Sequence, residues 1–158
     1  MQNIIRHTVL VTALAAPGIA LFIGPSLAHS QEPTGTVAKH DDVRVAQQLI
    51  DVHFQIWNDP NSRERAAKFP LVYSPTFFVA DESGVARGYA AVGRLIEELR
   101  ASHEGFVFTP DPIAWNHGIG RVTWGYGPRD NPNVVRGEDV FTIEDGKLAS
   151  ARVFINRK

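Results

Sequence analysis

The chain has 158 residues, a length that suits one domain, because a globular unit commonly holds roughly 100 to 150 residues. Hydrophobic residues make up 44% of it and charged residues 21%, which is typical of a soluble globular protein and unlike a disordered chain. The formal net charge is −1 and no run of like charges occurs, which argues against nucleic acid as a partner. The chain contains no cysteine, which excludes disulfides, thiolate metal ligands and a cysteine nucleophile.

Residues 1–28 have the pattern of a signal peptide. A short segment with one positive charge, Arg6, precedes the apolar run of residues 8–24, and the small residue Ala28 follows as the predicted cleavage point. A membrane-spanning helix needs about 20 apolar residues, whereas this run is shorter and contains Pro17. We therefore expect a periplasmic or secreted protein with no stable membrane insertion after cleavage.

The mature chain divides into a leader and a domain. Residues 29–40 are polar and contain Pro33 and Gly35, which predicts a flexible leader. Residues 41–158 form the predicted domain, and its first helix starts at Asp41 or Asp42 as the N-cap.

Three helices are predicted in the first half of the domain. The first carries two apolar stripes at three-to-four residue steps and ends at the turn cluster 58–61. The second is short and is broken or kinked by Pro70, and the third runs from about Tyr89 to Ser102. A strand of residues 76–81 lies between the second and third helices.

The second half of the domain is predicted to be β-structure. Its segments are rich in β-branched and aromatic residues and are separated by Gly, Pro, Asn or Asp; they are residues 106–109, 113–117, 121–126, 134–144 and 147–155. Asp145-Gly146 predicts a tight hairpin turn between the last two. Helices followed by a run of strands predict an α+β fold, with an antiparallel sheet and helices against one face.

Short motifs follow one another in a distinctive order between residues 43 and 155. They are the helix end Trp57-Asn58-Asp59, the strand end at Asp81, Gly88 before the third helix, the segment 103–108, Trp124 in mid-strand, and the hairpin from Gly137 to Leu148. In this order and spacing the chain resembles SnoaL-like proteins of the nuclear transport factor 2-like superfamily. The resemblance implies a cone, or cystatin-like roll, in which a curved antiparallel sheet wraps around three N-terminal helices and encloses a pocket. It also implies frequent dimerisation through the sheet, so a homodimer is expected.

Asp139 is the first candidate for chemistry. Strand alternation places it on one face with Val135, Gly137, Phe141 and Ile143, a face that is otherwise apolar. A carboxylate there loses solvation, so its pKa should rise unless it is paired or hydrogen-bonded. The other interpretation is an Asp that fixes the strand.

Asp81 and His53 are the second and third candidates. Asp81 shares a strand face with Phe77 and Val79, although the following Glu82-Ser83-Gly84 also suits an ordinary turn. The resemblance places Asp81 where ketosteroid isomerases carry their general base, Asp139 where they carry a protonated acid, and His53 near their oxyanion-hole tyrosine. Histidine in place of tyrosine argues against steroid isomerisation itself. Without that resemblance, His53 on an apolar helical stripe is better explained as a core histidine than as a catalyst.

Further residues are expected to line an apolar pocket or to belong to the core. They are Trp57, Tyr73, Phe77, Trp115, His117, Trp124 and Phe141. His103, near a helix C-terminus, is explained by an interaction with the helix dipole. The histidines are scattered without metal-binding spacing, and no phosphate or dinucleotide motif occurs, so neither a metal nor a cofactor is expected.

Three functions are compatible with this pattern. The first is a cofactor-independent acid/base enzyme of the isomerase, cyclase or hydrolase type acting on a small hydrophobic carbonyl or epoxide. In it, Asp81 or His53 is the base and Asp139 is the protonated acid. The second is a non-catalytic periplasmic binding module for a small hydrophobic molecule, and the third is an interaction protein that uses the outer face of the sheet.

Export can be tested directly. We expect protein recovered from the periplasm or the medium to begin near His29, because the signal segment is removed after Ala28. Intact-mass analysis measures this start point. A full-length product retained in the cytoplasm would contradict the prediction.

Overall fold

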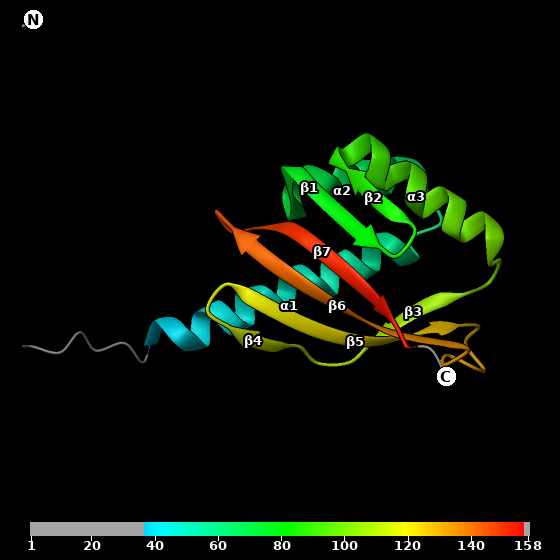
Figure 1. The fold of residues 1–158 in the computed structure, drawn as a ribbon. Coiled ribbons are helices and arrows are strands. Elements are labelled where there is room, and N and C mark those ends of the chain that lie inside the picture. Colours follow the sequence, from blue (N-terminus) through cyan, green and yellow to red (C-terminus); the bar gives the residue numbers. More distant parts are fainter. Residues whose placement is uncertain (1–36, 157–158) are drawn as a thin grey trace, which may run out of the picture. The chain divides into compact units, whose positions relative to one another are not determined.

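A computed structural model describes residues 37–156, which belong to one compact unit (Figure 1). The predicted signal segment and the leader up to residue 36 lie outside the described residues. In chain order the helices are α1 Val37–Asn58, α2 Ser62–Val72 and α3 Gly88–Ser102. The strands are β1 Tyr73–Asp81, β2 Gly84–Arg87, β3 Val107–Pro110, β4 Ala114–Asn116, β5 Ile119–Gly127, β6 Val135–Glu144 and β7 Lys147–Ile155. No helix among the described residues is long and apolar enough to cross a membrane.

The sheet confirms the α+β class, but it contains a strand that the sequence analysis does not predict, β2, and one parallel pair in what was expected to be an antiparallel sheet. Its order is β2-β1-β7-β6-β5-β3, with β4 paired to β5 off this path. All neighbouring strands pair antiparallel except β1 and β7, which are parallel. β1 and β7 are the first and last strands of the domain, so they are adjacent in the sheet but far apart in sequence. Turn signals between sequence neighbours therefore cannot predict this pair.

The helices cover one face of the sheet. Figure 1 shows the long α1 crossing behind the strands, with α2 and α3 beside β1 and β2. One of the two predicted apolar stripes of α1 contains Ala46, Ile50 and Trp57, and all three side chains are buried. The second stripe is less well covered, since Val45 on it is 45% exposed.

The ends of the first two helices depart from the expected positions. Helix α1 begins at Val37, before the predicted Asp41 cap, so residues 37–40 of the expected leader are helical. Helix α2 continues through Pro70 to Val72, and β1 starts directly at Tyr73. The N-cap of α2 is Asn61, whose side chain accepts hydrogen bonds from the first turn.

Two hydrogen-bonded ties fix the C-terminal end of α1, which carries His53 and Trp57. The Asn58 side chain donates to the Phe108 carbonyl at 2.9 Å and accepts from the Phe108 N–H at 2.7 Å, so it joins α1 to β3. Arg100 of α3 donates to the Asn58 carbonyl at 3.1 Å. These ties hold α1, α3 and β3 together around the interior.

The β-hairpins follow the predicted turn chemistry. Asp145 and Gly146 both have positive φ, 49° and 72°, as a tight two-residue turn requires. The register places Gly120 of β5 opposite Phe141 of β6, and the Phe141 ring lies over the glycine. Gly120 is therefore a position where the close approach of an aromatic ring excludes a side chain.

This contact predicts that Gly120→Ala destabilises the domain by roughly 1–3 kcal/mol, because the added methyl group overlaps the Phe141 ring. Urea unfolding measures the change in the free energy of unfolding. Gly93→Ala in α3 is the control, since its Cβ would meet Phe69 at an ordinary 3.7 Å and alanine favours the helix. Equal stability of the two variants would contradict the predicted overlap.

Candidate functional site

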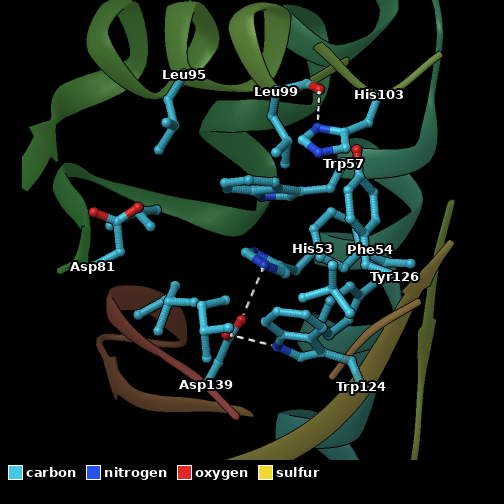
Figure 2. Close-up of a pocket in the computed structure, with 16 residues that line it drawn as sticks. His53, Phe54, Trp57, Asp81, Leu95, Leu99, His103, Trp124, Tyr126 and Asp139 are labelled. Carbon is cyan, nitrogen blue, oxygen red and sulfur yellow. Dashed lines mark hydrogen bonds and ion pairs between the residues drawn. The ribbon is translucent and has the colours of Figure 1, made fainter. Parts of the chain in front are cut away.

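An apolar cavity of about 250 Å³ lies between α1, α3 and the concave face of the sheet (Figure 2). Its lining is mostly aliphatic and aromatic, with a few polar groups among them. The lining residues are His53, Phe54, Trp57, Val79, Asp81, Leu95, Leu99, His103, Phe108, Trp124, Tyr126, Val135, Asp139, Ala151, Val153 and Ile155. A small apolar cavity with few polar groups is the usual form of a small-molecule site.

Asp139 lies in the cavity wall at the middle of β6 and is 5% exposed. The alternation of β6 buries Gly137, Asp139 and Phe141 on one face, as the sequence predicts. The indole Nε1 of Trp124 donates a 2.8 Å hydrogen bond to Asp139 Oδ1. Loss of hydration raises the pKa of Asp139 to about 7; the Trp124 hydrogen bond opposes the rise and the Glu138 charge adds to it. Asp139 is therefore about half protonated at neutral pH.

His53 on α1 faces Asp139 from the other side of the cavity and is 2% exposed. Burial lowers its pKa to about 3, so the imidazole is neutral at neutral pH. His53 Nε2 lies 3.8 Å from Asp139 Oδ2, longer than a hydrogen bond. On its other side, His53 Nδ1 lies 3.0 Å from the Tyr73 hydroxyl. Burial raises the pKa of Tyr73, so this hydroxyl keeps its proton and can donate it to Nδ1.

Asp81 lines the same cavity from the end of β1, at a different edge from Asp139 (Figure 2). Its Oδ1 accepts hydrogen bonds from Ser83 N–H at 2.8 Å, Ser83 Oγ at 2.6 Å and Gly84 N–H at 3.0 Å. Partial burial works to raise the pKa of Asp81, but these hydrogen bonds together outweigh it and lower the pKa. Asp81 thus forms the turn that its sequence allows, and it also lies at the cavity as an ionised carboxylate.

The cavity therefore contains two carboxyl groups whose pKa values move in opposite directions. Asp139 is pushed toward the neutral acid and Asp81 toward the carboxylate. Such a divergence is the usual signature of an acid and a base that share one site. The structure brings together all three residues that the sequence singled out for chemistry, since His53 lines the cavity as well.

Of the seven residues expected to line a pocket or to belong to the core, two line this cavity and five lie elsewhere. Trp57 and Trp124 line the cavity. Tyr73, Phe77 and Phe141 do not, because each is fully buried in the core, where Tyr73 and Phe77 stack at 4.1 Å between ring centroids. Alternation identifies the inward face of a strand but does not show where along it the helices already fill the space.

Trp115 and His117 also lie away from the cavity. Trp115 is half-buried on β4 and stacks on the Phe141 ring at 6.0 Å. His117 is exposed in the turn between β4 and β5, with a φ of 46°. The Asn116-His117-Gly118 segment therefore forms the turn that its composition suits, and its histidine does not reach the interior.

Sequence reasoning missed part of the lining that a pattern could have revealed. Leu95, Leu99 and His103 are each four residues apart, which places them on one face of α3. Tyr126 follows Val122 and Trp124 on the inward face of β5. The helix dipole explains a histidine at this helix end, but the four-residue spacing from Leu99 also places His103 at the cavity.

Among the described residues the buried Tyr126 Oη has no hydrogen-bond partner, and Trp57 Nε1 has none at normal hydrogen-bond geometry, although it lies close enough to the Tyr73 hydroxyl to lower the pKa of that group. Both side chains line this cavity. A buried polar group left without a partner costs roughly 1–3 kcal/mol. The cavity therefore offers hydrogen bonds that a bound molecule could complete.

No group of three or more residues able to hold a metal ion occurs among residues 42–156. The polar groups of the cavity are two separate carboxyls, two imidazoles, two indoles and one phenol. Their chemistry is proton transfer and hydrogen bonding.

Solved structures with the same fold confirm the resemblance. A SnoaL-like family protein from Agrobacterium tumefaciens, provisionally called an isomerase, superposes with a TM-score of 0.67 at 16% identity, over 72% of this chain and 99% of that one. A protein from Kribbella flavida provisionally called a ketosteroid isomerase gives a TM-score of 0.55 at 16% identity, over 74% and 82%. A protein of unknown function from Cytophaga hutchinsonii, described as NTF2-like, gives 0.53 at 12% identity, over 68% and 87%.

By sequence, no protein-family model and no curated protein matches the chain. The likeness to solved structures at these identities is one of fold. The described domain therefore has the nuclear transport factor 2-like cone, with the SnoaL-like and ketosteroid isomerase-like proteins among its structural neighbours.

The opposite pKa shifts of Asp139 and His53 predict opposite effects of pH on stability. Asp139 releases its proton at pH 3.8 when unfolded and at about 7 when folded, so its contribution to stability falls as the pH rises between these values. His53 binds a proton below pH 6.5 when unfolded and only below about 3 when folded, so its contribution rises with pH. In the wild-type protein the two trends oppose each other.

Asp139→Asn removes the opposing Asp139 trend and leaves the His53 trend in place. We expect its free energy of unfolding to rise with pH between 3.8 and 6.5 more steeply than that of the wild type. Urea unfolding at a series of pH values measures this difference. Asp130→Asn, at an exposed position, is the control and should follow the wild-type pH dependence. Parallel curves for Asp139→Asn and the wild type would show that Asp139 titrates like an exposed carboxyl.

Proposed function

We propose that the domain is an exported, cofactor-independent acid/base enzyme that moves a proton on a small, largely apolar substrate carrying a carbonyl or epoxide oxygen. The observation that carries the proposal is the pair of carboxyls in one apolar cavity, with the pKa of Asp139 raised and that of Asp81 lowered. Export rests on the sequence of residues 1–28.

For a ketone, the proposed step is the transfer of a proton from the carbon next to the carbonyl. The Asp81 carboxylate takes the proton, and the electron pair of the broken C–H bond forms the enolate, with its negative charge on oxygen. Neutral Asp139 donates a hydrogen bond or its proton to that oxygen. Return of the proton from Asp81 to a different carbon completes an isomerisation, and replacement of that proton by a solvent deuteron before its return to the same carbon completes an exchange. Any proton that Asp139 gave to the oxygen goes back to Asp139 in the same step.

His53 is better suited to support Asp139 than to act as the base. A pKa of about 3 makes its imidazole a weak proton acceptor. As a neutral group 3.8 Å from Asp139 Oδ2, it adds no positive charge that would favour ionisation of the acid. Its hydrogen bond with Tyr73 fixes the orientation of the ring.

The similar structures that carry isomerase or cyclase names support an enzymatic role through fold alone. A non-catalytic binding module for a small hydrophobic molecule is the second candidate. It is favoured by the three hydrogen bonds that hold Asp81 Oδ1 in the turn between β1 and β2, since a carboxylate so held is a weaker base.

The two candidates differ in one measurable reaction. We expect the protein to accelerate the exchange of hydrogen for deuterium next to the carbonyl of tetralone, a small bicyclic ketone that needs no assignment of the natural substrate. Proton NMR in heavy water measures the rate. Asp139→Asn and Asp81→Asn should each lower the rate by roughly 10² or more, because each removes one of the two proton-transfer groups. The rate should also fall as the pH rises through about 7, where Asp139 ionises.

Asp130→Asn serves as the control and should exchange tetralone at the wild-type rate, because its side chain is exposed and lies outside the cavity. Line broadening of the tetralone signals shows independently whether the ketone binds. Binding without exchange above the buffer rate would reject the enzyme and support the binding module.

A further inference from the structure

The hydroxyl of Tyr126 marks a second polar region of the cavity that the proposed proton transfer does not use. Tyr126 is 5% exposed, lines the cavity, and its hydroxyl has no hydrogen-bond partner among the described residues. Figure 2 shows this hydroxyl directed toward His103, and the two rings meet edge to face at 5.6 Å. A buried phenol hydroxyl usually has a partner.

The hydrogen bonds around His103 determine what its other nitrogen can offer. The Ser102 hydroxyl donates to the Leu99 carbonyl at 2.9 Å, so its oxygen is available as an acceptor. His103 Nδ1 lies 2.9 Å from that oxygen and 3.4 Å from the Leu99 carbonyl, and the tautomer with the proton on Nδ1 lets it donate to both acceptors. In the neutral ring this leaves Nε2 as a hydrogen-bond acceptor, and Nε2 has no partner among the described residues.

Tyr126 and His103 lie at the opposite end of the cavity from Asp81. Leu95 and Leu99 of α3 and His103, the C-cap residue that ends this helix, follow one another at four-residue steps, and all three line the cavity. Leu95 and Asp81 also line a neighbouring polar hollow together, so Leu95 marks the Asp81 end. Eight residues of α-helix span about 12 Å, which is the length of a small two-ring molecule with its substituents.

We propose that Tyr126 and His103 form a hydrogen-bonding subsite for a second oxygen group of the substrate. The Tyr126 hydroxyl donates to that group and His103 Nε2 accepts from it, which suits a hydroxyl. The substrate class is then a small, elongated apolar molecule with oxygen at both ends, one at the Asp81 and Asp139 carboxyls and one at this subsite. This inference rests on the proposed function for the reacting end only.

The subsite should act as a specificity element. A site that provides hydrogen bonds discriminates against a ligand that lacks the matching group, because its own buried polar atoms then stay unpaired. Removing the hydroxyl from Tyr126 should also leave the empty domain at least as stable as before, because that hydroxyl has no partner to lose. A tyrosine with a structural role would show the reverse.

Isothermal titration calorimetry with three probes tests the proposal on the folded protein. The probes are naphthalene, a naphthol with one hydroxyl, and a naphthalenediol whose hydroxyls lie at opposite ends of the ring system. We expect the diol to bind about tenfold or more tightly than the naphthol, because it completes the second set of hydrogen bonds. In Tyr126→Phe this preference should fall close to unity, with unchanged or higher thermal stability of the free protein.

Tyr89→Phe is the matched control, because the Tyr89 hydroxyl donates to the Tyr73 carbonyl and lies outside the cavity. It should keep the diol preference. Equal affinities of the diol and the naphthol for the wild type, or a preference that survives Tyr126→Phe, would overturn the subsite. A preserved preference without any exchange of tetralone would reject the proposed enzyme and retain the subsite. Failure of all three probes to bind would overturn the subsite, while the exchange of tetralone decides the proposed enzyme separately.

Discussion

Asp139 enters the interior of the domain because the two-residue period of β6 buries it together with Gly137 and Phe141. A carboxyl group in that position must find polar partners or give up its charge. It has one hydrogen-bond donor, Trp124 Nε1, and faces the neutral ring of His53. The balance raises the pKa of Asp139 to about 7. The other polar groups of the cavity are best understood by how they act on Asp139.

The surroundings of Asp139 are arranged by parts of the chain that lie far apart in sequence. Trp124 reaches it from the neighbouring strand β5, and His53 from α1, fixed in turn by the Tyr73 hydroxyl at the start of β1. Asn58, one residue beyond Trp57, joins the end of α1 to β3. The geometry of the acid therefore depends on the whole curved sheet and on the helix packed against it.

The cavity differs from a well-packed core in the groups that it leaves unsatisfied. Arg65 is also buried, but its guanidinium pairs with Glu97 and donates to the Asp59 carbonyl at 2.6 Å, so its charge is compensated. Tyr126 Oη has no such partner, and its side chain faces the cavity. This contrast within one domain favours a ligand site over a packing defect, because the same fold satisfies its structural polar groups elsewhere.

The sequence by itself determined the class of fold, most element boundaries and the inward faces of β1 and β6. Hydrophobic period, β-branched composition and the Asp145-Gly146 turn are local signals, and local signals fix local structure. Strand alternation also singled out Asp139 as a polar residue on an apolar face. The resemblance to ketosteroid isomerases, rather than the local pattern, raised Asp81 and His53 to candidates. The tertiary structure alone decided that β1 and β7 pair in parallel, and that Phe77 and Phe141 are core while Tyr126 and His103 face a cavity. An inward side chain meets either another side chain or empty space, depending on how much of the sheet's concave side the helices fill. This depends on the packing of the whole domain, so no local segment of the sequence reveals it.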